Sequence, residues 1–173
     1  MQPFHCIKMV AAMNPCPCGH YPDMNRCRCS PGEVSHYLGK ISQPLLDRID
    51  ICSDIPAVTF SQMKNNKKQE SSAEIKKRVE AARQMQKFRY QGTDISFNGE
   101  LKGREISRFC VLTTEAERLM GNAFEKMQFS ARSYHKILKV SRTIADLGGE
   151  EIIQTEHVAE ALSYRAFDKK YWN

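Results

Sequence analysis

The sequence has no long apolar run. No stretch approaches the roughly 18 apolar residues that a membrane-spanning helix needs. The first 13 residues also lack a charged start followed by a long apolar core, which is the pattern of an export signal. We therefore expect a soluble, cytoplasmic protein with no membrane partner, in a compartment where disulfides are disfavoured.

The size and composition are those of a globular protein. The chain has 173 residues, of which 41% are hydrophobic. This is enough for one domain, or two small ones, with a genuine core.

The positive charge is concentrated in one segment. The net charge is +6, and the segment from Lys64 to Arg89 has nine basic and three acidic residues, so the remainder is neutral. A concentrated basic stripe is typical of nucleic-acid contact, although a solvated helix face gives the same pattern. The candidate contacts are Lys67, Lys68, Lys76, Lys77, Arg78 and Arg83.

Four of the seven cysteines lie within fourteen residues, as Cys16-Pro-Cys18 and Cys27-Arg-Cys29. Thiols at positions i and i+2 of an extended segment point to the same side, so each pair can hold one ion. The surrounding prolines and glycines disfavour regular structure, and a metal would supply the missing cohesion. The pattern predicts a structural zinc site, with His20 as a substitute ligand. Free buried thiols and two disulfides are the alternatives.

The first third of the chain alternates between strand and helix signals. Residues 6–13 predict a buried strand that ends at Asn14-Pro15. Ser30 and Glu33 have the spacing of a capping box and predict a helix over 31–40. A further helical turn at 43–47 and a strand at 49–55 complete a small α/β portion.

The last two thirds of the chain predict helices only. Ser71 and Glu74 form a second capping-box pattern, and they open a helix with Ile75, Val79, Ala82 and Met85 or Gln86 at helical spacing. After a loop at 93–103, helices are predicted at 104–110, 114–126, 130–147 and 155–167.

The helix predicted at 130–147 has one apolar face. At 100° per residue, the core stripe comprises Tyr134, Ile137, Leu138, Ser141, Ile144 and Ala145. Arg132 points the opposite way, and the cations or histidine on its side are His135, Lys136, Lys139 and Arg142. This polar side is either a solvated face or an anion site near the helix start.

Three strings carry a resemblance to a known family. They are MVAAMNPCPCG at 9–19, QPLLDRID at 43–50 and SARSYHKILKVSRTIADL at 130–147. The chain resembles magnesium-chelatase-like AAA+ proteins of the ComM/YifB type over nearly its whole length, most weakly from Thr59 to Ser72.

The resemblance implies a mainly α fold with a partial α/β portion. Residues 1–60 would be the C-terminal part of a P-loop ATPase core with a cysteine-rich insertion, 61–72 a basic linker, and 73–173 a helical lid. No G-x-x-x-x-G-K-[ST] phosphate loop occurs. We therefore expect a C-terminal fragment that does not hydrolyse ATP alone.

The resemblance also assigns roles to three residues. Asn14 matches sensor 1, which orients the attacking water, Arg48 matches the arginine finger, and Arg132 matches the sensor 2 arginine. The implied cofactors are ATP and Mg²⁺, and the implied assembly is a homo-oligomeric ring, expected to be a hexamer.

Three functions remain open at this point. The first, implied by the family resemblance, is that the longer protein containing this fragment is a DNA helicase or branch-migration motor acting in DNA uptake and recombination. A second reading is a non-enzymatic, zinc-stabilised module that binds nucleic acid or protein. A third is a magnesium chelatase subunit, which the cysteines disfavour because thiolates suit zinc better than hard magnesium.

Overall fold

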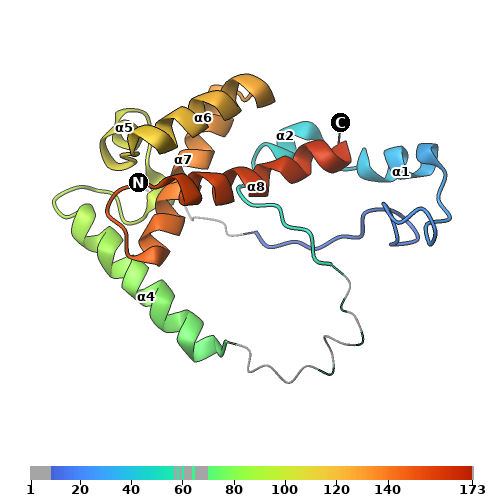
Figure 1. Ribbon diagram of the computed structural model, residues 1–173, viewed down its shortest axis with the longest axis horizontal. Helices are drawn as coiled ribbons and strands as arrows, with labels where there is room; N and C mark the ends of the chain where they lie inside the picture. The colour runs from blue at the N-terminus through green and yellow to red at the C-terminus, as the bar shows by residue number, and fades with distance from the viewer. Residues whose placement is uncertain (1–8, 57, 59, 61–63, 65–69, 173) are drawn as a thin grey trace, which may run out of the picture.

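The structure is a computed structural model that describes residues 9–56, 58, 60, 64 and 70–172, with side chains described as far as Arg165. The described helices follow one another as shown in Figure 1. They are α1 (Pro31–Leu38), α2 (Gln43–Leu46), α4 (Ser72–Arg89), the 3-10 helix η1 (Asn98–Glu100), α5 (Arg104–Phe109), α6 (Thr114–Met127), α7 (Ala131–Gly148) and α8 (Thr155–Trp172). The mainly helical character is confirmed. None of these described helices has the length and apolarity needed to cross a bilayer.

The predicted helix starts agree with the structure to within one residue, because capping interactions between near neighbours in the sequence determine them. At α1 and α4 the capping serine, Ser30 or Ser71, accepts from the backbone of Glu33 or Glu74, and each glutamate carboxylate accepts in return. At the far end of α7, Gly149 has φ of 79°, a left-handed conformation that suits glycine and ends the helix.

The two predicted strands are wrong for the residues that the structure describes. Residues 9–13 and 49–55 have no regular secondary structure, and 9–13 are exposed rather than buried; residues 6–8 lie outside the described part. A strand needs a neighbour to satisfy its backbone N–H and C=O groups, and no described segment runs beside either one as a strand. The α/β portion is therefore not formed in the described chain.

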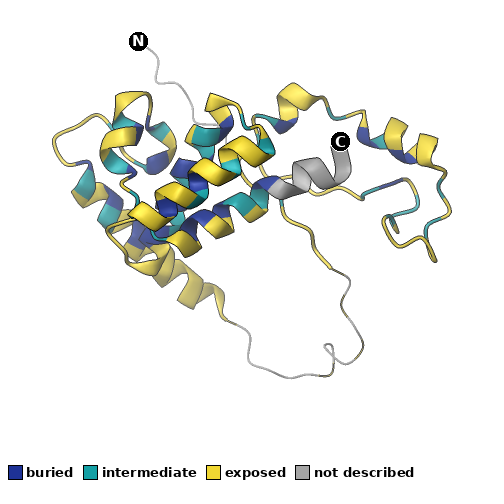
Figure 2. Ribbon diagram, turned by 45° about the horizontal axis from the view of Figure 1, so that its top comes forward, coloured by how far each residue is buried: buried dark blue, intermediate teal, exposed yellow. Residues whose placement is uncertain are grey.

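The main core lies where α6, α7 and α8 meet. Figure 2 shows the buried residues gathered on the facing sides of these helices. Ile137, Leu138 and Ala145 of the predicted α7 stripe are almost fully buried, against Met120 of α6 and Val158 of α8. The predicted apolar face of α7 is thus confirmed.

One short backbone contact joins the connections on either side of this core. Leu112 and Ile153 form an isolated parallel bridge, in which Ile153 N donates to Val111 O and Thr113 N donates to Ile153 O. This bridge holds the N-terminus of α6 beside the N-terminus of α8.

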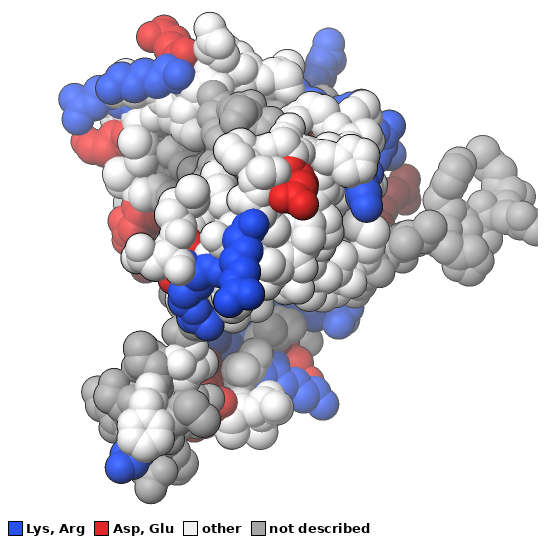
Figure 3. Space-filling view, turned by 90° about the vertical axis from the view of Figure 1, so that its right-hand side faces the viewer, with Lys and Arg blue, Asp and Glu red and all other residues white. Residues whose placement is uncertain are grey.

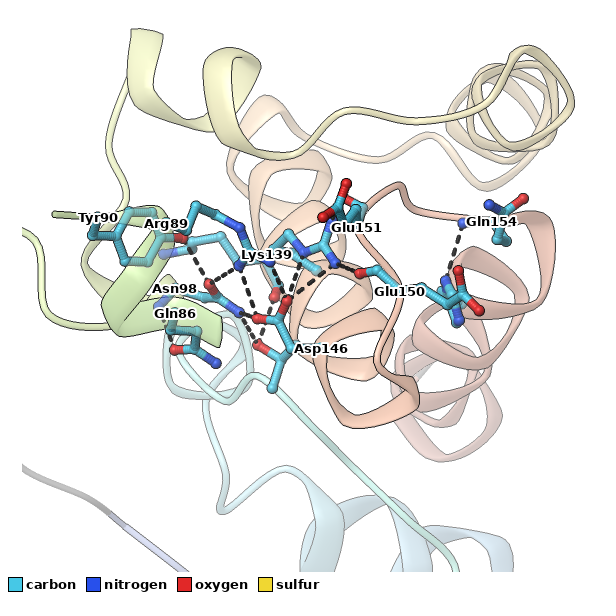
Figure 4. Close-up of polar contacts among 12 residues, drawn as sticks. Gln86, Arg89, Tyr90, Asn98, Lys139, Asp146, Glu150, Glu151 and Gln154 are labelled. Carbon is cyan, nitrogen blue, oxygen red and sulfur yellow. Dashed lines mark hydrogen bonds and ion pairs between the residues drawn. The ribbon is translucent and has the colours of Figure 1, made fainter. Parts of the chain in front are cut away.

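A buried polar network fixes α4 and η1 against α7 (Figure 4). The Asp146 carboxylate accepts two hydrogen bonds from Arg89, at 3.0 and 2.5 Å, one of 2.9 Å from Asn98 Nδ2, and one of 3.1 Å from Arg142 Nε. Burial alone would lower the pKa of Arg89, but Asp146 outweighs it and raises that pKa. Arg89 therefore stays charged at neutral pH.

Arg142 corrects the helical-wheel prediction for α7. The helical wheel places Arg142 on the polar side of α7, yet its side chain is 0% exposed. Besides Asp146, its guanidinium donates to the carbonyl oxygens of Glu150 and Glu151 in the connection to α8. The helical-wheel projection does not predict this burial, because Arg142 lies near the edge of the apolar stripe and its long side chain reaches sideways under a neighbouring segment.

Only the second half of α4 packs on the domain. Gln86 accepts from Asn98 N, and the Tyr90 hydroxyl donates to Asn98 Oδ1 at 2.7 Å. Ile75 and Val79 of the predicted apolar stripe are each 43% exposed, because the first half of α4 extends beyond α7 (Figure 1). Of the residues at helical spacing on α4, Ala82 and Gln86 are buried, whereas Ile75 and Val79 are exposed.

Replacing Asp146 tests the network. Asp146→Ala leaves the fully buried Arg142 guanidinium without its counterion, and we expect the free energy of unfolding to fall by about 3–5 kcal/mol in urea titrations. Glu125→Ala, an exposed carboxylate on α6, is the matched control and should change it by less than about 0.5 kcal/mol. Equal, small effects of both substitutions would contradict the account.

Candidate metal centre and basic groove

The four clustered cysteines converge on one point. Cys16 Sγ lies 3.4 Å from Cys18 Sγ and 3.8 Å from Cys27 Sγ, and Cys18 Sγ lies 3.6 Å from Cys27 Sγ. All four sulfurs, including that of Cys29, lie within 4.8 Å of one another. A tetrahedral zinc ion with Zn–S bonds of about 2.3 Å places its sulfurs about 3.8 Å apart. The spacing therefore fits a four-thiolate zinc site.

Two tight turns bring the cysteine pairs together. Gly19 N donates to Cys16 O at 3.0 Å, and Gly19 has φ of 80°, which favours glycine there. In the second turn, Cys27 N donates to Asp23 O at 2.7 Å. The Tyr21 amide also points at Cys16, with N to Sγ of 3.4 Å, as an outer hydrogen bond to a ligand would.

The cysteine pairs share a small core with α1. Cys16 is 0% exposed and clusters with Val34 and Leu38 of α1, with Tyr21 and Tyr37 at the margin. This second core has few large apolar side chains, so a metal would add cohesion that the packing does not provide. All four cysteines are free thiols here, which sets the disulfide alternative aside for this structure.

The environment of the cysteines lowers the pKa of Cys16 and Cys18 and raises the pKa of Cys27 and Cys29. Backbone N–H groups of Arg28 and His20 lower the pKa of Cys18 to about 6. The backbone of Cys18 acts in the same direction on Cys29, but burial and the neighbouring Cys18 and Cys16 sulfurs outweigh it and raise the pKa of Cys29 to about 12. A divalent cation removes this mutual repulsion. His20 is exposed and outside the cluster.

A second feature is an open basic groove beside the start of α7. It has a volume of about 580 Å³ and lies between the end of α2, the segment before α5, and the first turns of α7. Arg48 and Arg132 both line it. The other cationic or titratable bases on its walls are Lys102, His135, Lys136 and Lys139, and Asp47 is the acid. The groove is suited to a polyanion such as a phosphate chain.

Local structure explains how the two arginines are presented. Arg48 follows the four-residue helix α2, and its Nη1 donates to Pro44 O at 2.6 Å, which folds the side chain along that turn. Arg132 is the second residue of α7, where the helix dipole favours an anion. Both residues are exposed. The anion-site alternative for Arg132 thus stays open alongside the solvated face.

The third residue assigned to the phosphate site lies elsewhere. Asn14 is exposed, precedes the first cysteine pair, and lies next to the Gly19 turn, where a Cβ on Gly19 would be 3.7 Å from its side chain. It is not among the residues that line the groove. The chain therefore brings Arg48 and Arg132 together and leaves Asn14 apart.

The basic stripe is only partly described. Lys67 and Lys68 lie outside the described residues, while Lys76, Lys77, Arg78 and Arg83 are exposed on α4. Two of these are locally paired, Lys76 with Glu80 at 3.7 Å and Arg78 with Glu70 at 2.9 Å. On the end of the molecule shown in Figure 3, Lys and Arg likewise occur in small groups between acidic and uncharged side chains.

The sequence does not predict the contacts that two cations make with the segment around Arg48. Lys136 and Arg165 contact the backbone that carries Arg48, with Nζ of Lys136 and Nη1 of Arg165 each 3.2 Å from Ile49 O. The segments are 87 and 116 residues apart. No sequence pattern signals a contact of this kind, because it depends on how α7 and α8 pack against α2.

Family models match almost the whole chain in two parts. Residues 69–165 match the family described as magnesium chelatase, subunit ChlI C-terminal, and residues 3–63 match magnesium chelatase, subunit ChlI.

Curated relatives align over nearly the same extent. Competence protein ComM of Haemophilus influenzae is 41% identical over 161 residues, which is 92% of this chain and 31% of that protein. YifB of Salmonella typhimurium and YifB of Escherichia coli are each 40% identical over 164 residues, 94% of this chain and 31% of theirs. The chain thus spans about a third of the length of these relatives.

Proposed function

The chain belongs to the magnesium chelatase ChlI family, and we propose that it is the C-terminal part of a ring-forming AAA+ ATPase that moves DNA. The observation that carries the proposal is the shared groove of Arg48 and Arg132, whose walls also hold Lys102 and Lys139. Nucleotide phosphates are the polyanions that an ATPase must hold and stabilise.

In this proposal the two arginines act on the terminal phosphate of ATP. Phosphoryl transfer is catalysed mainly by positioning and by stabilising charge on the γ-phosphate, and guanidinium groups do both. Arg132 contacts the phosphate from the start of α7, and Arg48 supplies the arginine finger. Asn14 lies outside this groove, and its assignment to the attacking water rests on the family pattern alone. ATP and Mg²⁺ are the cofactors, and the finger acts across a subunit boundary in a hexameric ring.

The proposal divides the chain into an ATPase part and a lid. Residues 1–60 complete the ATPase core, residues 61–72 connect this core to the lid, and residues 73–173 form the helical lid. The sequence has no G-x-x-x-x-G-K-[ST] phosphate-binding loop, and in this proposal that loop and the magnesium ligands belong to another part of a longer protein. We expect no ATP hydrolysis by the 173 residues alone.

Substituting Arg48 in the longer protein tests the finger. Arg48→Ala is expected to lower kcat for ATP hydrolysis by about 10³-fold or more, since arginine fingers contribute 10³–10⁵, while nucleotide binding is retained. Arg118→Ala, an exposed arginine on α6, is the control and should leave turnover unchanged. Unchanged turnover in Arg48→Ala refutes the assignment.

We further propose that Cys16, Cys18, Cys27 and Cys29 hold one structural zinc ion. The support is the convergence of the four sulfurs within 4.8 Å and the mutual repulsion that a cation would relieve. The zinc would fix the two turns beneath α1.

Elemental analysis tests the zinc site directly. The chain purified under reducing conditions should contain about one equivalent of zinc, because four thiolates complete its tetrahedral shell. Cys16→Ser with Cys18→Ser should lose it, whereas Cys52→Ser, outside the cluster, should keep it. Less than about half an equivalent in the unmodified chain defeats the proposal.

DNA is the proposed macromolecular partner. The support is the set of exposed cations on α4, Lys76, Lys77, Arg78 and Arg83, together with the relative named as a competence protein. The same cations support a second candidate, a zinc-stabilised module that binds nucleic acid without being an enzyme. A chelatase subunit is the remaining alternative, and the thiolate cluster does not favour magnesium handling.

Salt-dependent binding tests the DNA partner. The affinity of this chain for a labelled duplex should fall steeply with salt, because each phosphate contact releases a counterion. Replacing Lys76, Lys77 and Arg83 together by alanine should reduce the slope of log K against log salt by about 3, roughly one per cation. Lys126→Ala on α6 is the single-charge control. Absence of binding at low salt counts against both DNA readings.

A further inference from the structure

The helix that precedes Arg48 cannot hold its position by itself. α2 has only four residues, and its N-cap, Ser42, makes no side-chain capping bond. So short a helix has no intrinsic stability in water. Its placement must come from tertiary contacts, and the buried side chain of Leu46, 1% exposed, is one of them.

Two cations from the helical domain contact the backbone around Arg48. Nζ of Lys136 donates to Ile49 O at 3.2 Å and pairs with Asp50 at 3.2 Å. Nη1 of Arg165 donates to the same Ile49 oxygen at 3.2 Å and to Leu46 O at 3.5 Å, and its Nη2 lies 3.6 Å from Asp47.

These contacts lie on both sides of Arg48 in the sequence and avoid its guanidinium. Leu46 O lies at the end of α2 and Ile49 O lies beyond it, and a carbonyl oxygen shielded from water needs a donor, which a cation supplies. Both cations are well shielded from solvent, with 13% of the Lys136 side chain and 7% of the Arg165 side chain exposed. Shielding strengthens such charge-assisted hydrogen bonds. The turn is thereby fixed while the Arg48 side chain is left in the groove.

Lys136 lies one helical turn beyond Arg132 on α7. Residues four apart project from the same face, so a phosphate contact at Arg132 and the peptide contact at Lys136 are made by one rigid element. Any shift of α7 that follows a contact at Arg132 therefore moves the attachment point of the Arg48 turn.

We propose that Lys136 and Arg165 are positioning residues: they join the turn that carries Arg48 to α7 and α8, so that the lid sets the placement of the arginine finger. This proposal rests on the proposed function of Arg48. It adds a mechanical link between the lid and the finger within one chain, through Ile49 O as the shared acceptor.

The kinetic test uses the longer ATP-hydrolysing protein. Lys136→Ala should lower kcat by about 10- to 100-fold, as expected for a misplaced catalytic group, and change KM for ATP less than about twofold. Lys136→Arg can still reach Ile49 O and Asp50, and it should recover most of kcat. Lys126→Ala is the control and should match the unmodified protein. Unchanged kcat in Lys136→Ala overturns the proposal, as does a lost kcat that Lys136→Arg fails to recover.

Hydrogen exchange on this chain provides an independent measurement. The amides of Leu46, Asp47, Arg48 and Ile49 each donate within the turn. In Lys136→Ala their exchange should accelerate by about tenfold or more, while the amides of α6 and the second half of α7 keep their protection. Unaltered exchange in this turn overturns the proposal even if Arg48→Ala is inactive. If Arg48→Ala remains active, the proposed function fails, whereas faster exchange still supports the link itself.

Discussion

The buried carboxylate of Asp146 is the interaction on which the arrangement of the helical domain depends. An uncompensated carboxylate would be very costly at this depth, so it requires the donors that surround it. Those donors come from the end of α4, from η1 and from α7 itself. The requirement that one anion be fully satisfied thereby fixes three segments relative to one another. Arg142 extends the same network to the connection that leads into α8.

With α7 fixed in this way, its remaining faces serve different purposes. One face supplies the apolar core with α6 and α8. The start of the helix presents Arg132 to the basic groove, and one turn later Lys136 contacts the segment that carries Arg48. The proposed phosphate site and the proposed link to the finger therefore share one helix, whose position is set by a network farther along it.

The cysteine segment is held together on a different basis. Its core with α1 is small, and four converging sulfurs occupy the place where apolar side chains would otherwise be needed. α1 makes contact with α8, and the chain then continues into α2. A metal in the cysteine cluster would thus stabilise the segment that leads to Arg48, at a distance from the groove itself.

The sequence determined the features that depend on near neighbours in the chain. These are the helix starts at Ser30 and Ser71, the end of α7 at Gly149 and the apolar face of α7. The i, i+2 spacing likewise placed two thiols together in each half of the cysteine cluster. The sequence also predicted strands that need a partner segment, and these did not form in the described chain. Tertiary packing alone decided that Arg142 is buried and that Lys136 reaches Ile49 O. Helical periodicity gives the direction of a side chain from its own axis, but which neighbouring segment lies there depends on the whole fold.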